Sequence, residues 1–337
     1  MASGVDPAAL TLNLAEGGSA TVNKVVHTPP IPPNPDIVFL VDITTSMGPV
    51  IANVQANASS VLSQVLAAQP TAQFAVADYK DQADPAPIFN VRQNLTADTG
   101  AVQAAINALS LSGGGSDAPE DWINALFEIA TGAISFRSNG TRLVVLIGDS
   151  SSHDPSLFHS LGDATSALND AEIRVIAIDV GPTPGEISDG LNAALQATTV
   201  AAATGGAYLV APSPDQVSNV ILAGLQNLPV TVTPSTANCD PNLSVSWSPA
   251  SVTVTSGSGT SFAETIAVAP SATPGTTLAC SVNFLLNGEL QPGFTQAVVN
   301  QVPKHPSVLT VSDATSDFHD PGILSAVLTD GITNGPI

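Results

Sequence analysis

Charged side chains are scarce in this sequence, and bases are scarcer than acids. Asp, Glu, Lys and Arg make up 10% of the 337 residues, against roughly 25% in an average soluble protein. Seven Lys and Arg stand against 28 Asp and Glu, which gives a formal net charge of −21. Binding nucleic acid or an anionic membrane needs clustered bases, whereas these are spread along the chain. We expect neither partner, and the excess of carboxylates suits a hard divalent cation.

Cysteines and long apolar runs are also rare. No stretch of about 18 consecutive apolar residues occurs, so we expect no membrane insertion. The two cysteines, Cys239 and Cys280, lie in a strand-like region rich in Ser and Thr. We predict one disulfide across a β-sandwich, and hence a secreted or cell-surface protein in an oxidising compartment. Two buried free thiols are the alternative.

The hydrophobic pattern changes along the chain, and the length exceeds what one core usually serves. From Asp36 to Leu228, short apolar runs alternate with helical stretches, a pattern typical of a parallel sheet covered by helices on both faces. The runs span 37–41, 74–79, 143–148 and 173–180. The first helix shows an apolar face at spacings of three and four until Pro70 ends it. This face consists of Val50, Val54, Ala58, Val61 and Val65.

Residues on both sides of this segment have the alternating pattern of β-strands. From Val230 to about Val302, short alternating segments separated by turn residues predict a β-sandwich. Residues 8–34 alternate around a Gly17-Gly18 turn and end in prolines, which predicts a hairpin and a stiff linker. An isolated hairpin is marginal in water, so we expect these residues to supply strands to the sandwich. A separate hairpin is the alternative.

We therefore predict a multidomain chain in which an α/β domain is inserted in a β-sandwich. Residues 8–34 form the amino-terminal strands and the linker, 35–228 the α/β domain, and 229–303 the remainder of the sandwich. Residues 304–337 alternate again, contain an Asn334-Gly335 turn and are too few for a core. We expect them to begin a further immunoglobulin-like module.

A carboxylate and two hydroxyls follow the first predicted strand. Asp42, Thr44 and Ser46 occupy alternate positions, so their oxygens point the same way, as a small cation with oxygen ligands requires. Loops at this edge of an open α/β sheet form the ligand crevice. The alternative is that Ser46 only caps the following helix.

Further acids lie where the same edge is expected. A glycine-rich loop delivers the carboxylates of Asp117 and Glu120 just before a predicted helix, although Asp117 is also a candidate N-cap with Pro119 in the first turn. Asp149 and Asp81 each follow an apolar strand. Any one of these residues suits a cap or a turn, but together they predict a metal site.

The segment from about Asp36 to Leu228 resembles a von Willebrand factor A domain, which has a doubly wound, Rossmann-like α/β fold. An Asp-x-Thr-x-Ser triplet, an acidic loop and a later Asp after a central strand occur in the order typical of the family's metal-ion-dependent adhesion site. The resemblance implies a Mg²⁺ or Mn²⁺ ion held by this triplet, Glu120 and Asp149. It also implies that the ion binds an acidic side chain of a partner protein.

The acidic loop is most similar to that of integrin β-subunit domains, which are themselves set within a sandwich. The resemblance implies a second cation, Ca²⁺, beside the first. Its ligands would be Asp81, Asp117, the backbone oxygen of Pro119 and the shared Glu120. Gly115 stands where that family has an asparagine, so this site has one oxygen fewer. We expect no third site, because Pro49 and Val50 replace its acids.

Two other functions fit parts of the sequence. Residues 148–150 resemble the Gly-Asp-Ser block of GDSL-type esterases, with His153 and Asp154 nearby and another Asp and His at 317–319. The block is central here and near the amino terminus in that family, so we expect no enzyme. The histidines lack the spacing of a zinc site. The other alternative is a structural stalk or assembly protein whose cation only stabilises the fold.

Overall fold

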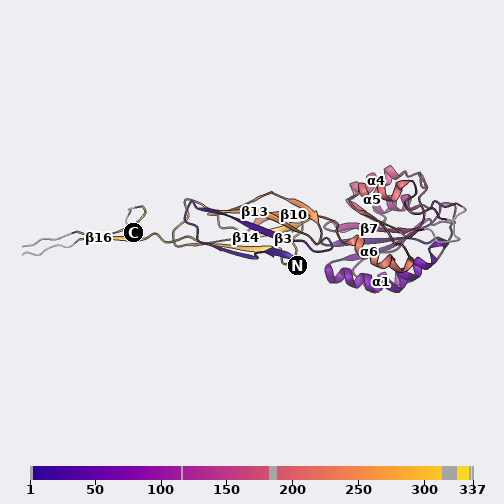
Figure 1. Cartoon of the computed structure of the whole chain (residues 1–337), viewed down its shortest axis with the longest axis horizontal. Helices are drawn as coiled ribbons and strands as arrows, with labels where there is room; N and C mark the ends of the chain where they lie inside the picture. The colour runs from indigo at the N-terminus through magenta and orange to yellow at the C-terminus, as the bar shows by residue number, and fades with distance from the viewer. Residues whose placement is uncertain (1–2, 115–116, 182–187, 313–324, 334, 336–337) are drawn as a thin grey trace, which may run out of the picture.

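The computed structural model describes residues 3–114, 117–181, 188–312, 325–333 and 335. Figure 1 shows an elongated molecule with an α/β domain at one end, a β-sandwich in the middle and a two-stranded hairpin beyond it. Among the described residues, no helix has the length and apolar character needed to cross a membrane.

The α/β domain is built on a six-stranded sheet in the order β6-β5-β4-β7-β8-β9. Its strands are β4 (Pro35–Asp42), β5 (Gln73–Tyr79), β6 (Phe89–Thr96), β7 (Thr141–Gly148), β8 (Ile173–Asp179) and β9 (Ala207–Val210). Neighbouring strands are parallel except β5 and β6, which are antiparallel. The four predicted strands are thus parallel neighbours, but the sheet is mixed because the antiparallel edge strand β6 was not predicted: it is half exposed and has no continuous apolar run.

Helices cover both faces of this sheet. One face packs against α1 (Gly48–Ala68), α2 (Thr99–Asn107) and α6 (Val217–Leu225), and the other against α3 (Trp122–Glu128), α4 (Leu161–Asp170) and α5 (Gln196–Ala203). Short helical turns span Thr45–Met47, Ile129–Ala133, Ala193–Leu195 and Pro214–Gln216. The predicted apolar face of α1 is buried, and the helix ends just before Pro70.

The sandwich consists of two sheets around a common apolar core. One sheet contains β1 (Gly4–Asp6), β3 (Ser19–His27), β13 (Gly259–Val268) and β11 (Leu243–Ser248), in that order. The other contains β12 (Val252–Thr255), β10 (Pro229–Ala237), β14 (Thr277–Leu286), β15 (Thr295–Gln301) and β2 (Ala9–Leu12). Phe262 from the first sheet and Phe284 from the second meet in this core with ring centroids 5.8 Å apart.

Residues 8–34 do not form the predicted hairpin. β2 pairs with β15 in parallel, whereas β3 lies between β1 and β13 in the other sheet. The backbone of Gly17 and Gly18 bonds to Val268 where the chain passes between the sheets. The alternation of apolar residues is the same in either arrangement, because side chains from both sheets point into one interior.

Cys239 and Cys280 form a disulfide, as predicted. The bridge does not cross the sandwich, however. Cys239 follows β10 and Cys280 lies on β14, and these strands are hydrogen-bonded neighbours in one sheet. Periodicity predicts strands but not their order in the sheets. The prediction that the bridge joins the two sheets was therefore wrong.

One turn of the sandwich holds both chain connections to the α/β domain. Ser256 donates from Oγ to Pro30 O and accepts there from Leu228 N, each at 3.0 Å. Gly257 N donates to Pro29 O at 2.7 Å. The outgoing and returning segments therefore meet at one buried serine.

Beyond the sandwich, β16 (Ser307–Val311) and β17 (Ala326–Asp330) form an antiparallel hairpin with exposed apolar side chains. His305 contacts Asp330 of the hairpin and Glu16 of the sandwich. Asn334 and the Asp and His at 317–319 lie outside the described residues.

Candidate metal centre

The first motif is folded around one buried carboxylate. Asp42 is the last residue of β4 and is fully buried. Thr44 donates to Asp42 Oδ1 from its backbone nitrogen at 2.8 Å and from its hydroxyl at 2.7 Å. The Thr44 hydroxyl also lies 3.2 Å from that of Ser46. Met47 occupies the N-cap position of α1, so Ser46 lies outside the cap that was the alternative interpretation.

Asp149 joins this motif from the neighbouring strand. It follows β7, is fully buried and accepts a hydrogen bond from Ser46 Oγ at 3.1 Å. Ser150 donates to the same oxygen, Oδ1, at 3.3 Å. The preceding Gly148 has no room for a side chain, because a Cβ would overlap the hydroxyl of Tyr79.

Glu120 reaches the same place from the acidic loop. Its backbone forms a parallel bridge with the segment after β7, in which Glu120 N donates to Ser151 O at 2.8 Å and His153 N donates to Glu120 O at 2.9 Å. Only 2% of Glu120 is exposed. Asp121 occupies the N-cap position of α3, so Asp117 does not cap this helix.

The three buried carboxylates each keep one oxygen without a hydrogen-bond partner among the described residues. These atoms are Asp42 Oδ2, Glu120 Oε2 and Asp149 Oδ2. Burial raises the pKa of Asp42 to about 7, that of Asp149 to about 6 and that of Glu120 to about 10. Repulsion between these carboxylates adds to the increase for Asp42 and Glu120. Because buried charges require partners, this donor set suits a divalent cation.

A second cluster lies beside the first. Asp81 follows β5 and is fully buried, whereas Asp117 is exposed. Their carboxylates and the His153 imidazole offer ligand atoms that all lie within 4.8 Å of one another. Pro119 lies in the same loop, and Gly115 is outside the described residues. His153 N donates to Glu120 O at 2.9 Å, so the two clusters are neighbours, and repulsion from Asp81 contributes to the raised pKa of Glu120.

Sequence reasoning did not include His153 among the metal ligands. It considered this histidine for hydrolase chemistry, and for a zinc site only through the spacing of the histidines along the chain, which argued against one. The available signal was that His153 lies in the same loop as Asp149, directly after a strand of the predicted parallel sheet.

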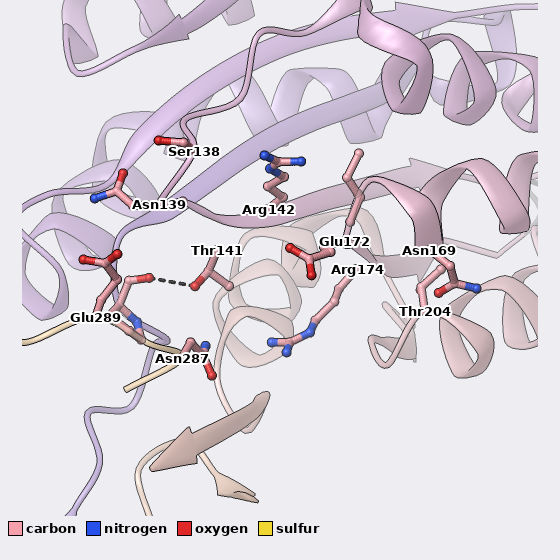
Figure 2. A pocket seen from close by; sticks show the side chains of 13 residues that line it. Ser138, Asn139, Thr141, Arg142, Asn169, Glu172, Arg174, Thr204, Asn287 and Glu289 are labelled. Carbon is pink, nitrogen blue, oxygen red and sulfur yellow. Dashed lines mark hydrogen bonds between the residues drawn. The ribbon is translucent and has the colours of Figure 1, made fainter. Parts of the chain in front are cut away.

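A cavity of about 420 Å³ lies at the opposite edge of the sheet (Figure 2). Its lining includes Arg142 and Arg174, close to the starts of β7 and β8, and Asn287 and Glu289 from the sandwich. The carboxylates described above belong to the other edge, where the parallel strands end. The cavity is therefore separate from the candidate metal centre.

The family model of the von Willebrand factor type A domain matches residues 36–218. The chain therefore belongs to this family, whose domains are generally protein-interaction or adhesion modules and often bind a divalent metal. No curated protein matches the chain significantly in sequence.

Two solved structures are similar in part. A von Willebrand factor type A structure from Catenulispora acidiphila is 13% identical, with a TM-score of 0.43 over 89% of this chain and 74% of that one. Proximal thread matrix protein 1 from the mussel byssus is 14% identical, with a TM-score of 0.43 over 61% of this chain and 48% of its own. This chain thus spans about half the length of the mussel protein's chain.

Proposed function

We propose that this protein is a cation-dependent adhesion module that binds an acidic side chain of a partner protein through a metal. The metal, Mg²⁺ or Mn²⁺, is held by Asp42, Thr44, Ser46, Glu120 and Asp149. The observation that carries the proposal is that three buried carboxylates from separate segments each keep one oxygen unpartnered among the described residues. A bound cation would supply the positive charge that this group lacks.

The overall charge supports a metal-mediated contact. A chain with a net charge of −21 repels an acidic ligand unless a cation lies between them. Mg²⁺ takes about six oxygen ligands and usually keeps several waters. The protein side chains named here do not fill such a shell, which leaves a position for a carboxylate of the partner.

The position of the site supports a role in contacting other molecules. β4 starts at Pro35, close to the linker that bonds to the sandwich, and ends at Asp42. The parallel strands beside it run the same way. The carboxylates that we propose as metal ligands therefore lie where these strands end, at the edge of the sheet away from the sandwich (Figure 1).

The same proposal includes the domain layout. We propose that 35–228 is inserted in a sandwich made of 8–34 and 229–303, and that 304–337 begins an immunoglobulin-like module. Pairing of β3 with β13 and of β2 with β15 supports the insertion, since each pair joins the amino-terminal segment to the later strands. The disulfide supports a secreted or cell-surface location.

We also propose that the chain is not a serine hydrolase. Ser150 Oγ donates to Asp149 and not to a histidine, unlike the nucleophile of a Ser-His-Asp triad. His153 Nε2 lies 3.6 Å from Asp81, and Asp154 accepts a hydrogen bond from the backbone of Leu161. These contacts support separate roles rather than a catalytic relay.

A calorimetric titration with Mg²⁺, followed by titration with a short peptide carrying one Glu, tests the proposal. We expect Mg²⁺ to bind and the peptide to bind only in its presence. The Asp42→Ala variant should lose both heats, and a peptide with Gln in place of Glu should not bind. Mg²⁺ binding without peptide binding would favour the stalk interpretation, in which the cation only stabilises the fold. An absence of Mg²⁺ binding would contradict both.

A further inference from the structure

A histidine and two carboxylates meet beside the proposed adhesion site, brought together from three separate parts of the chain. Asp81 follows β5, Asp117 precedes α3, and His153 lies in the loop after β7. One ligand atom from each lies within 4.8 Å of the others. Nitrogen and oxygen donors are thus available to one ion.

Asp81 has the features of a ligand rather than of a structural carboxylate. Its side chain is fully buried, and one oxygen, Oδ1, accepts a hydrogen bond from the backbone of Ala83. The other oxygen, Oδ2, has no hydrogen-bond partner among the described residues. This buried oxygen is the atom that lies nearest His153 Nε2 in the ion pair.

The separation of Asp81 Oδ2 and His153 Nε2 favours a shared ion over a direct hydrogen bond. Asp81 Oδ2 and His153 Nε2 are 3.6 Å apart, beyond the usual range of about 2.7–3.2 Å for such a bond. Two ligands of one tetrahedral zinc ion, each at about 2.1 Å from it, are about 3.4 Å apart. The observed separation is close to that value, and His153 Nε2 likewise has no hydrogen-bond partner in the described part of the chain.

We propose that Asp81, Asp117 and His153 form a second metal site that selects a nitrogen-accepting transition-metal ion such as Zn²⁺ over Ca²⁺ or Mg²⁺. An imidazole suits Zn²⁺ and its neighbours in the transition series, whereas Ca²⁺ and Mg²⁺ take oxygen ligands. Three protein ligands leave one tetrahedral position for water. This inference replaces the Ca²⁺ expected from the integrin resemblance and does not depend on the adhesion function.

Co²⁺ absorption of the full chain, with Zn²⁺ competition, tests this site. Both cysteines are in the disulfide, so thiolate ligands do not contribute to the spectrum. We expect an intense visible band on adding Co²⁺, as four-coordinate sites give, and its loss on adding one equivalent of Zn²⁺. Excess Ca²⁺ or Mg²⁺ should leave the band unchanged.

Matched variants separate this site from the adhesion site. His153→Ala should weaken Zn²⁺ binding more than the roughly 10- to 100-fold that loss of an outer partner costs, and leave Mg²⁺ binding intact. Asp42→Ala should lose Mg²⁺ binding and keep the Co²⁺ band. His305→Ala is the control for a histidine between carboxylates, because His305 contacts Glu16 and Asp330 from opposite ring nitrogens.

Exposed Asp117 provides a second variant that does not disturb the core. If His153→Ala fails to fold, Asp117→Asn takes its place in the experiment. This variant should also weaken Zn²⁺ binding. A Co²⁺ band that survives either substitution in the folded protein overturns the proposal. Displacement of Co²⁺ by Ca²⁺ as readily as by Zn²⁺ also overturns it.

Discussion

Ser46 Oγ donates a hydrogen bond to Asp149 Oδ1 at 3.1 Å, and this contact joins the loops that follow two adjacent parallel strands. Asp149 Oδ2 remains without a hydrogen-bond partner among the described residues. The contact therefore orients the Asp149 carboxylate and leaves its other oxygen available to bind a cation.

Divalent cations should stabilise the folded protein. A ligand present at 100 times its Kd adds about 2.7 kcal/mol to the free energy of unfolding. We expect Mg²⁺ to raise Tm by several degrees relative to EDTA in a calorimetric scan. Asp42→Ala should abolish this rise and Glu120→Gln should reduce it. Asp154→Asn is the control, because Asp154 is exposed and belongs only to the hydrolase interpretation.

Without metal, stability should fall as the pH rises. The pKa values of Asp42 and Asp149 are raised to about 7 and about 6, from about 3.9 in an unfolded chain. Between about pH 4 and pH 7 the folded state therefore binds more protons than the unfolded state. The stabilising contribution of these two carboxyl groups is complete below about pH 4 and is lost as the pH rises to about 7. In EDTA we expect Tm to fall between about pH 5 and pH 8, and Mg²⁺ to flatten this dependence.

Asp42→Asn should also flatten the pH dependence in EDTA. Asp42→Asn should be compared with its parent in a protein that also carries His305→Gln. The reason is that the raised pKa of His305 also makes stability fall as the pH rises. A Tm in EDTA that rises over this pH range would contradict the assignment of buried, mutually repelling carboxylates.

His305 should titrate above its ordinary pKa. Its contacts with Glu16, and then with Asp330, raise the pKa of His305. The stabilising contribution is complete below about pH 6.5 and is lost as the pH rises through the raised pKa. An NMR titration should show this shift, and Glu16→Gln should reduce it. Titration near 6.5 in the unaltered protein would mean that the contacts do not persist in solution.

Gly148→Ala should destabilise the α/β domain. The added Cβ overlaps the buried Tyr79 hydroxyl, and overpacking of this kind costs about 1–3 kcal/mol. Denaturant unfolding measures the loss. The matched control is Gly162→Ala in α4, where a Cβ meets its nearest neighbour at 3.6 Å and should be tolerated. Equal effects of the two substitutions would argue against the overlap at Gly148.

The two domains should differ in their ability to fold alone. A fragment of residues 35–228 keeps its whole sheet and all of its helices, so we expect a dispersed NMR spectrum. A fragment of residues 229–303 lacks β3 and β2, which leaves the edge of β13 unpaired and part of the core exposed. Cooperative folding of this second fragment would contradict the insertion proposal.

The sequence predicts best what depends on local pattern. The buried strands β4, β5, β7 and β8 coincide with continuous apolar runs, and the acids after them meet because parallel strands end at one edge. Their proximity could therefore be predicted from Asp42 and Asp149, while metal binding itself stays a prediction. β6 was missed because a half-exposed edge strand has a mixed pattern.

Features that depend on pairing between distant segments could not be predicted. The side chains of Leu10 and Val26 face the same core from different sheets, and alternation alone does not distinguish this from a hairpin. His153 meets Asp81 only because two loops converge at the sheet edge. The spacing of histidines along the chain does not predict a contact between residues so far apart in sequence.

The turn at Ser256 bonds to both connections between the domains, which has a mechanical consequence. Tension applied by a partner at the tip of the molecule would reach the sandwich through two covalent connections side by side. The load would be divided between them, and both connections are also held to this turn by hydrogen bonds. The junction is thus suited to carrying a pulling force while keeping the α/β domain aligned with the sandwich.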